Sequence, residues 1–277
     1  MKLGSRHWQA IHALLRKRDN SVSLGPAWQQ IHEELEVGER RGNRLHFSDE
    51  MLRILRQAAE RTSGADLLVA APGSTRLEAA RQGFIDEKNA RQRPDDGYVL
   101  VKGTLPAPLL SLSPELSQRV PVSRLDLDAI KQIVVIENLD SFDDWQYYAA
   151  LVELADSLLL YRGHGGLARG TRRLLASLPA ATHVIVFPDY DPAGLSIAIG
   201  LPRADALLVP ALDEQLLAKG SREHFARQSR QASHLDASQL DGWQAVWTAM
   251  KEQQVSIKQQ HMLALDTPLR LVRRNSR

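Results

Sequence analysis

The sequence predicts an α/β protein in which a parallel sheet follows a smaller α+β region. In the second half of the chain, short apolar runs alternate with helical segments. Strands and helices that alternate at this spacing indicate right-handed βαβ units and a sheet covered on both faces. The first third instead has helical periodicity and one basic turn. A hydrophobic fraction of 43% supplies enough apolar residues for a core in such a protein.

The first third is expected to contain three amphipathic helices. Apolar residues recur at helical spacing in 6–18, and a second helix begins near Pro26, which suits a first helical turn because it has no amide hydrogen. A Gly-Asn turn within 39–47 is flanked by basic residues and a short strand. Ser48 then suits the N-cap position of a helix over 49–61. Its predicted buried side carries Met51, Leu52, Ile54 and Leu55.

This order of elements is compatible with a winged-helix or helix-turn-helix module. Such a module would lay six basic residues near a phosphate backbone. They are Arg16, Lys17, Arg18, Arg40, Arg41 and Arg44. A small helical domain with a solvated basic rim explains the same pattern. The net charge of +2 does not decide between them, because 35 basic residues nearly cancel 33 acidic ones.

The middle of the chain predicts short elements and a connector. We expect a strand at 67–71, a helix at 74–81, an exposed charged loop at 83–97 and a strand at 98–102.

The proline-rich stretch 105–121 has the composition of a connector with little regular structure. The predicted domain boundary therefore lies near Ser123. It separates an N-terminal winged-helix-like DNA-binding region with its connector, 1–122, from a second domain, 123–277.

The second domain has the alternation of strands and helices that is typical of a Rossmann-like parallel sheet. The expected strands are 133–136, 158–161, 183–187 and 206–209, and the expected helices are 142–154, 167–178 and 192–199. Ligands of such sheets bind at the carboxyl ends of the strands. A helical tail follows, in which Trp243, Val246, Trp247 and Met250 have core spacing. The terminus 270–277 is basic and is expected to be mobile.

Two carboxylates follow the third of these strands. Asp189 and Asp191 stand two residues apart, so both can leave the strand end on the same face. Close carboxylates repel, and a hard divalent cation keeps both ionised. We therefore predict a Mg²⁺ site here. Asp-rich turns also cap helices, which is the structural alternative.

Glu137 ends the apolar strand 133–136, where a carboxylate needs water, a partner or a metal. It is predicted to be a metal ligand or a general acid/base acting with the Asp pair.

A glycine-rich loop and three arginines indicate phosphate binding at the same edge. The loop contains Gly163, His164, Gly165 and Gly166, and the following helix carries Arg169, Arg172 and Arg173. Backbone amides of such a loop can approach a phosphate, although its glycines also permit an ordinary tight turn. Carboxylates, a cation and phosphate-binding groups together suit phosphoryl transfer. Nothing matches a P-loop, so ATP hydrolysis is not expected.

Composition excludes other classes of site. There is no cysteine, so disulfides, thiolate zinc sites and a cysteine nucleophile are excluded. The start lacks the apolar core of a secretory signal and no run is long enough to cross a bilayer, so we expect a cytoplasmic protein without a membrane partner.

Three stretches together resemble a Toprim domain: 134–142, 161–166 and 187–194. They are similar to the Toprim half of topoisomerase VI A-type proteins and of the nuclease subunits in SMC-like plasmid-defence systems (Wadjet or MksBEFG type). The resemblance spans about 130–209, with a looser match to a winged-helix module in the first third. In those families the strand-end Glu and the Asp-x-Asp pair bind Mg²⁺. The resemblance thus implies that Glu137, Asp189 and Asp191 hold Mg²⁺ or Mn²⁺, in a homodimer that grips double-stranded DNA.

One departure distinguishes the two groups of relatives. Topoisomerase VI-type enzymes cut through a tyrosine in the winged-helix region, but this chain has no tyrosine before Tyr98. Hydrolysis by metal-activated water is therefore favoured, as in the defence nucleases, whose SMC-like ATPase and kleisin recognise plasmid DNA. Residues 255–261 are similar to a basic, Gln-containing segment of some relatives, which implies that Lys258 approaches DNA. A solvated helix face explains that segment equally well.

Three alternatives remain. The chain could be a DNA-binding assembly subunit whose acidic edge is structural, or a transesterase that forms covalent protein-DNA adducts. A haloacid-dehalogenase-type phosphatase fits less well. That class needs its Asp pair after the first strand, with Thr or Val two residues beyond, and here Ala193 stands in that place after the third strand.

Overall fold

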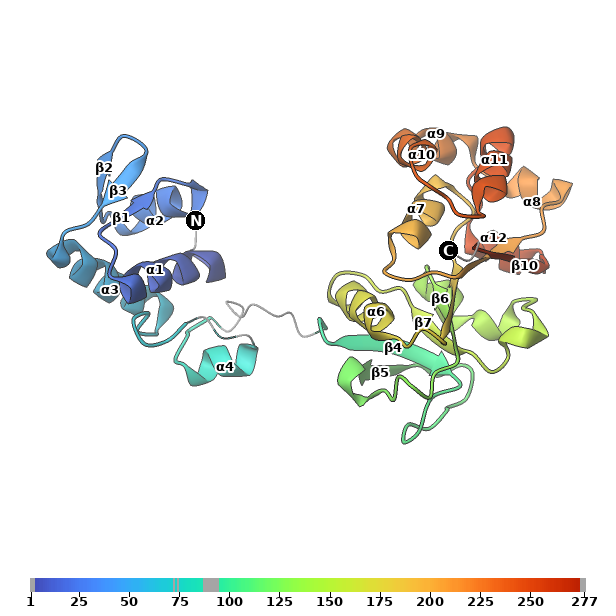
Figure 1. The fold of residues 1–277 in the computed structure, drawn as a ribbon, viewed down its shortest axis with the longest axis horizontal. Coiled ribbons are helices and arrows are strands. Elements are labelled where there is room, and N and C mark those ends of the chain that lie inside the picture. The colour runs from blue at the N-terminus through green and yellow to red at the C-terminus, as the bar shows by residue number, and fades with distance from the viewer. Residues whose placement is uncertain (1–2, 72, 74, 87–94, 275–277) are drawn as a thin grey trace. The chain divides into compact units, whose positions relative to one another are not determined.

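The computed structural model describes residues 3–71, 73, 75–86 and 95–274, in two compact units, 1–94 and 95–277 (Figure 1). Each unit has its own hydrophobic core. The division falls earlier than the predicted boundary near Ser123, because two strands that precede Ser123 belong to the sheet of the second unit. These are β4 (Tyr98–Gly103) and β5 (Gln118–Pro121), which pair with each other in antiparallel register. The stretch 105–121 is therefore more than a connector.

The first unit contains the predicted helices and ribbon. Its elements are α1 (Ser5–Lys17), β1 (Ser21–Ser23), α2 (Pro26–Leu35), β2 (Glu39–Arg41), β3 (Arg44–His46), α3 (Asp49–Ser63) and α4 (Arg76–Arg81). Within its described residues, the strands form one antiparallel sheet in the order β1-β3-β2. Pro26 opens α2, and the Ser48 hydroxyl accepts a hydrogen bond from the Met51 amide (3.2 Å). Both predicted helix starts are confirmed.

Two predictions for the first unit are wrong. Ile54 was expected on the buried side of α3 but is 43% exposed, because the buried stripe runs through Leu55, Ala58 and Ala59. Residues 67–69 form a turn, and residues 70–71 have no regular structure, so the predicted strand is absent from this described stretch. The Asp66 carboxylate accepts the Leu68 amide (3.0 Å), and the Asp66 carbonyl accepts the two following amides, so the backbone hydrogen bonds stay local.

The second unit is built on a mixed sheet, not on the predicted all-parallel one. Within 95–274 its order is β10-β9-β8-β6-β7-β4-β5. The four parallel strands are β6 (Gln132–Ile136), β7 (Leu158–Tyr161), β8 (His183–Phe187) and β9 (Ala206–Pro210). Antiparallel strands flank them: β4 pairs with β7, and β10 (Leu269–Arg273) pairs with β9.

The helix predicted over 142–154 is interrupted. It is replaced by α5 (Leu139–Asp143) and the 3₁₀ turns Trp145–Tyr147 and Val152–Leu154. Buried Lys102 of β4 donates to the Asp143 carbonyl (2.7 Å) and the Gln146 side chain (3.0 Å), which holds this turn in place. The Trp145 and Tyr148 rings stack with centroids 5.9 Å apart. These contacts favour the broken path over a continuous helix.

The remaining helices follow the predicted order. They are α6 (Gly166–Ser177), α7 (Pro192–Gly200), α8 (Glu214–Lys219), α9 (Arg222–Ala226), α10 (Ser229–Asp236), α11 (Gln244–Gln253) and α12 (Gln259–Ala264), with a 3₁₀ turn at Val122–Arg124. The predicted core positions Trp243, Val246, Trp247 and Met250 are buried.

The basic terminus was expected to be mobile, but β10 places residues 269–273 in the sheet. Residues 87–94, within the predicted loop, and 275–277 lie outside the described residues. In the part of the chain that the structure describes, no helix is long and apolar enough to span a membrane.

Candidate functional site

The candidate site lies where the winding of the parallel sheet reverses. Strand β6 leads to β7 on one side, whereas β8 leads to β9 on the other, and β6 and β8 are neighbours. In open α/β sheets, ligands bind outside the carboxyl ends of strands at such a reversal. Glu137 follows β6, and Asp189 and Asp191 follow β8. The structure therefore places all three predicted carboxylates at this point.

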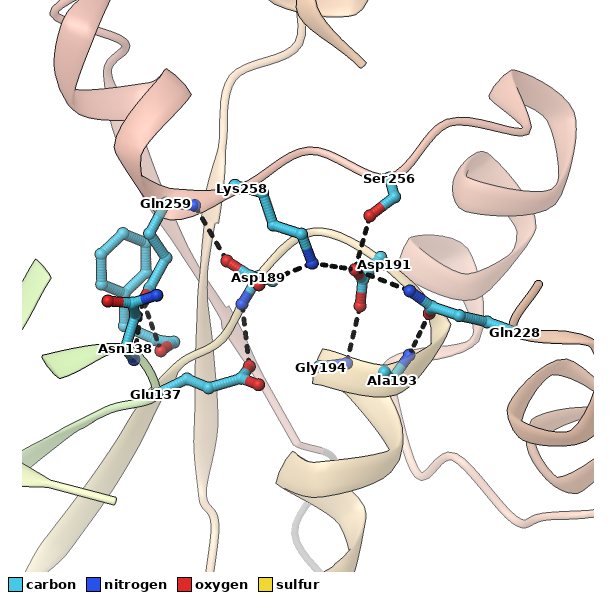
Figure 2. Close-up of polar contacts among 11 residues, drawn as sticks. Glu137, Asn138, Asp189, Asp191, Ala193, Gly194, Gln228, Ser256, Lys258 and Gln259 are labelled. Atoms are coloured by element: carbon cyan, nitrogen blue, oxygen red, sulfur yellow. Dashed lines mark hydrogen bonds and ion pairs between the residues drawn. The ribbon is translucent and has the colours of Figure 1, made fainter. Parts of the chain in front are cut away.

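Backbone pairing brings Glu137 and Asp189 into contact. Ile136 pairs with Phe187, and the Glu137 amide donates to the Phe187 carbonyl (3.1 Å). The Asp189 amide in turn donates to Glu137 Oε2 (3.1 Å), as Figure 2 shows. The neighbouring strand ends thus hold the Glu137 carboxylate beside the Asp189 backbone.

Asp191 is fully buried and has donors on both oxygens. Its Oδ1 accepts the Gly194 amide (2.8 Å), so Asp191 caps α7, and Pro192 stands at the first helical position as predicted. Its Oδ2 accepts three side chains, all drawn in Figure 2: Gln228 (3.0 Å), Ser256 (2.6 Å) and Lys258 (2.9 Å). Asp191 is therefore both a helix cap and the acceptor for three side-chain donors.

Lys258 bridges the two aspartates. Its Nζ lies 2.9 Å from Asp189 Oδ2 and 2.9 Å from Asp191 Oδ2. The other Asp189 oxygen accepts the Gln259 amide (2.9 Å). One ammonium therefore neutralises part of the negative charge that the two carboxylates place at the strand end.

Gln259 forms hydrogen bonds with both strand ends. Its buried side chain donates to the Phe187 carbonyl (2.8 Å) and accepts the Asn138 amide (3.0 Å). Because its own amide also donates to Asp189, this residue holds the loops that carry Glu137 and Asp189 together.

The electrostatic environment shifts the pKa values of the three carboxyls in different directions. Burial, reinforced by repulsion from Asp189, raises the pKa of Glu137 to about 7. Burial also raises the pKa of Asp189, despite attraction to Lys258. Glu137 is thus able to take up or release a proton near neutral pH in this arrangement.

At Asp191 and Lys258, the combined effect of several partners outweighs that of burial on the pKa. Burial alone would raise the pKa of Asp191, but donation from Ser256, Gln228, the Gly194 amide and Lys258 outweighs burial and lowers that pKa. Burial would lower the pKa of Lys258, but both aspartates hold its pKa above the usual range. Asp191 and Lys258 therefore form a stable ion pair.

The donor set has the chemistry of a Mg²⁺ or Mn²⁺ site. Hard divalent cations prefer carboxylate oxygens, and three carboxylates follow two neighbouring strand ends here. In Figure 2 the Glu137 carboxylate faces the Asp189 amide, whereas the Asp189 carboxylate faces Lys258 and Gln259. Among the described residues, no group of three or more His, Asp or Glu side chains is already arranged as a metal-ligand cluster. The ammonium of Lys258 lies between the two aspartates instead. The residue types fit the cation, and a ligand cluster would require the side chains to rearrange.

The predicted phosphate-binding loop precedes α6. Gly163 has φ of 85°, and a Cβ there would lie 2.5 Å from the Ala168 amide nitrogen, so the turn requires glycine. Gly165 and Gly166 occupy the helix start, and His164 is exposed.

The three arginines of α6 do not share a common partner. Arg169 pairs with Asp96 (2.7 Å) and Arg172 donates to the Gly200 carbonyl (2.6 Å), while Arg173 is exposed. Among the described residues, none of these arginines contacts the three carboxylates.

The six basic residues of the first unit that were predicted to lie near a phosphate backbone are exposed. Arg16, Lys17 and Arg18 end or follow α1, and Arg40, Arg41 and Arg44 lie on the β2–β3 ribbon. Arg41 pairs with Glu39 (2.9 Å), and Arg44 donates to the Ser21 hydroxyl (2.7 Å). Part of this positive charge is engaged within the unit, and contact with DNA stays a prediction.

Sequence reasoning missed Gln228, Ser256 and Gln259. One available signal was the alternation in 255–258, where apolar Val255 and Ile257 are interleaved with polar Ser256 and Lys258. This is the period of an extended segment with one polar face. The structure pairs Ile257 with Tyr190 in an antiparallel bridge, which turns that polar face toward the aspartates. The partner of such a segment is not visible in local sequence.

The fold and site define an α/β protein with an acidic strand-end centre. The chain belongs to the family described as "Domain of unknown function (DUF7281)", whose model matches residues 93–271, nearly all of the second unit. No curated protein matches this chain.

Proposed function

We propose that this protein is a metal-dependent DNA endonuclease that hydrolyses phosphodiester bonds at the acidic centre of a Toprim-type domain. The observation that carries the proposal is that Glu137 and Asp189 meet at the reversal point of the sheet. The backbone amide of Asp189 donates a hydrogen bond to the Glu137 carboxylate (3.1 Å). Asp191 lies beside them and shares Lys258 with Asp189.

In this proposal Asp189 and Asp191 hold Mg²⁺ or Mn²⁺, and Glu137 is either a third ligand of the cation or the general acid/base of the reaction. When bound, the cation polarises the scissile phosphate and lowers the pKa of an attacking water. Glu137, with its raised pKa, accepts or returns a proton. Gln259 keeps the two strand ends together, and the Lys258 ammonium supplies positive charge next to the phosphate.

DNA as substrate is supported by the exposed basic residues of the first unit and by the resemblance to Toprim nucleases. The helix, ribbon and helix order of that unit supports a winged-helix-like role. On the same resemblance, the protein is the cleaving subunit of an SMC-like plasmid-defence complex, acts as a homodimer and meets an ATPase and a kleisin in the cytoplasm.

The test is cleavage of supercoiled plasmid by the full chain with Mg²⁺, with Mn²⁺ or with EDTA. The expected result is nicking or linearisation that requires metal and is lost in Glu137→Gln. This variant removes a charge but keeps an oxygen for the Asp189 amide. Glu153→Gln is the matched control, because Glu153 is exposed on a 3₁₀ turn away from the three carboxylates. Equal cleavage by wild type and Glu137→Gln would refute the site assignment.

A structural acidic edge is the second candidate, and one observation favours it: Asp191 is fully buried, and both its carboxylate oxygens accept hydrogen bonds from the protein itself. That candidate predicts DNA binding without cleavage, even when SMC-like partners are added to the assay.

A transesterase has less support. A transesterase would need a tyrosine nucleophile in the first unit, but Tyr98 lies in β4 of the second unit, with the Arg119 guanidinium 3.5 Å from its ring centroid. The hydrolase proposal therefore predicts that no covalent protein-DNA adduct forms.

A further inference from the structure

Lys258 stands out because it touches both aspartates and is less buried than either. Its side chain is 37% exposed, compared with 11% for Asp189 and 1% for Asp191. Figure 2 shows the ammonium between the two carboxylates, at the end of an extended lysine stem. A long stem lets the charged head move to solvent while the backbone stays in place.

The ammonium and a divalent cation need the same oxygens. Asp191 Oδ2 already accepts Gln228, Ser256 and Lys258, so a cation that binds this oxygen must replace a donor. Ser256 is 1% exposed, and its backbone is bridged to Ser221. Gln228 also accepts the Ala193 amide (2.7 Å). Of the three donors, only Lys258 carries a positive charge that would repel the arriving cation.

We propose that Lys258 is a built-in counter-cation, which neutralises Asp189 and Asp191 in the metal-free protein and leaves them when a divalent cation binds. The inference rests on the proposed metal site. It assigns Lys258 a second position, with the ammonium released toward the face where a phosphate backbone would bind. Metal loading and the positive charge offered to substrate are therefore coupled through one side chain.

The neighbouring contacts allow this exchange without unfolding the site. Three sets of contacts hold this segment without the Lys258 side chain. They are the hydrogen bond from the Gln259 backbone amide to Asp189, the hydrogen bonds of the Gln259 side chain to both strand ends, and the β-bridge between Ile257 and Tyr190. The backbone of 256–259 can thus stay in place while Lys258 changes rotamer.

The first experiment measures Mg²⁺ and Mn²⁺ binding by calorimetry on the full chain without DNA. Lys258→Met is expected to bind at least about tenfold more tightly than wild type, because removal of an opposite charge leaves two uncompensated carboxylates. Its melting temperature in EDTA is expected to fall and to rise more on Mg²⁺ addition than that of wild type.

Two variants serve as controls. Lys258→Arg keeps the charge and is expected to stay close to wild-type affinity. Lys251→Met makes the same change in net charge at a surface lysine that pairs with Asp236 (3.0 Å), and it is expected to leave metal affinity unchanged.

The second experiment uses only the wild-type protein, so its result does not depend on whether a variant folds. Amine acetylation followed by mass spectrometry compares Lys258 with Lys251 in EDTA and in saturating Mg²⁺. Lys258 is expected to react faster when Mg²⁺ is present, whereas Lys251 is not. If metal binds but neither the affinity of Lys258→Met nor the Lys258 labelling changes, the counter-cation inference is overturned and the nuclease proposal stands. If no divalent cation binds wild type or variant, both are overturned.

Discussion

Replacing Asp191 by Asn should destabilise the second unit strongly even when no metal is present. Asp191 accepts the Gly194 amide on one oxygen and three side chains on the other. Asn has one oxygen, which can serve only one of these sets. Placing it toward the three side chains removes the carboxylate charge from all three bonds, so those from Gln228 and Ser256 become neutral and that from Lys258 is no longer an ion pair, and it abandons the Gly194 cap.

The expected cost follows from these contacts. Charge-assisted hydrogen bonds exceed neutral ones by about 1 kcal/mol each, and a lost N-cap costs about 1 kcal/mol, which gives about 4 kcal/mol. Asn also removes a buried charge, and this relief offsets part of the loss. The pKa of Asp191 is lowered in the folded protein, so the fold prefers the charged form and the relief is the smaller term. We expect a net loss of about 3 kcal/mol, near the range for breaking a buried ion pair.

The assay is urea unfolding in EDTA with pulsed hydrogen exchange, because peptides from β8 and α7 report on the second unit separately from the first. Asp213→Asn is the matched control: Asp213 also caps a helix, α8, through its contact with the Leu216 amide (2.8 Å), but it is exposed. Since Asn caps as well as Asp, that variant should change stability by less than about 0.5 kcal/mol. A loss for Asp191→Asn no larger than for Asp213→Asn would refute the ion-pair reasoning.

Two further predictions concern packing and pH. Gly170→Ala should destabilise the second unit by about 2 kcal/mol or more, since its Cβ would lie 1.9 Å from the Tyr98 carbonyl oxygen, whereas Gly200→Ala, with nothing within 4 Å, should be neutral or slightly stabilising in the same unfolding assay. Burial lowers the pKa of His7 from 6.5, so the neutral form is favoured in the fold. Stability of the first unit should therefore be full above pH 6.5 and decline below it, more weakly in His7→Gln, as peptides from α1 would report. An unchanged decline in the variant would contradict the assignment to His7.

Local signals predicted much of the fold. The four parallel strands are short apolar runs, and the residues that open α2, α3 and α7 were recognised from capping chemistry and proline placement. The sequence failed where a distant residue decides. Helix α5 stops at Asp143 beside Lys102, 41 positions earlier in the chain, and β5 pairs with β4 across a proline-rich loop. Apolar periodicity contains neither contact.

The candidate site follows the same division. Glu137, Asp189 and Asp191 could be placed together because the ends of parallel strands meet at one sheet edge. The groups that neutralise them could not, since Lys258 lies 67 and 69 positions from its two partners. Resemblance indicated a DNA-binding role for Lys258, whereas the structure shows its contacts with both aspartates, so that role remains a prediction.

The three carboxylates differ in how many structural contacts they make, and this difference decides which of them can be tested by mutation. Asp191 supports a helix start and three side chains, and Asp189 accepts Lys258 and the Gln259 amide, so replacement of either perturbs the arrangement of the later segment 256–259. Glu137 Oε2 accepts the Asp189 amide, an interaction that Gln can reproduce. Lost cleavage in an Asp191 variant would therefore mix chemistry with stability. Lost cleavage in Glu137→Gln at unchanged stability would isolate the charge of one carboxylate, which makes Glu137 the most informative of the three positions.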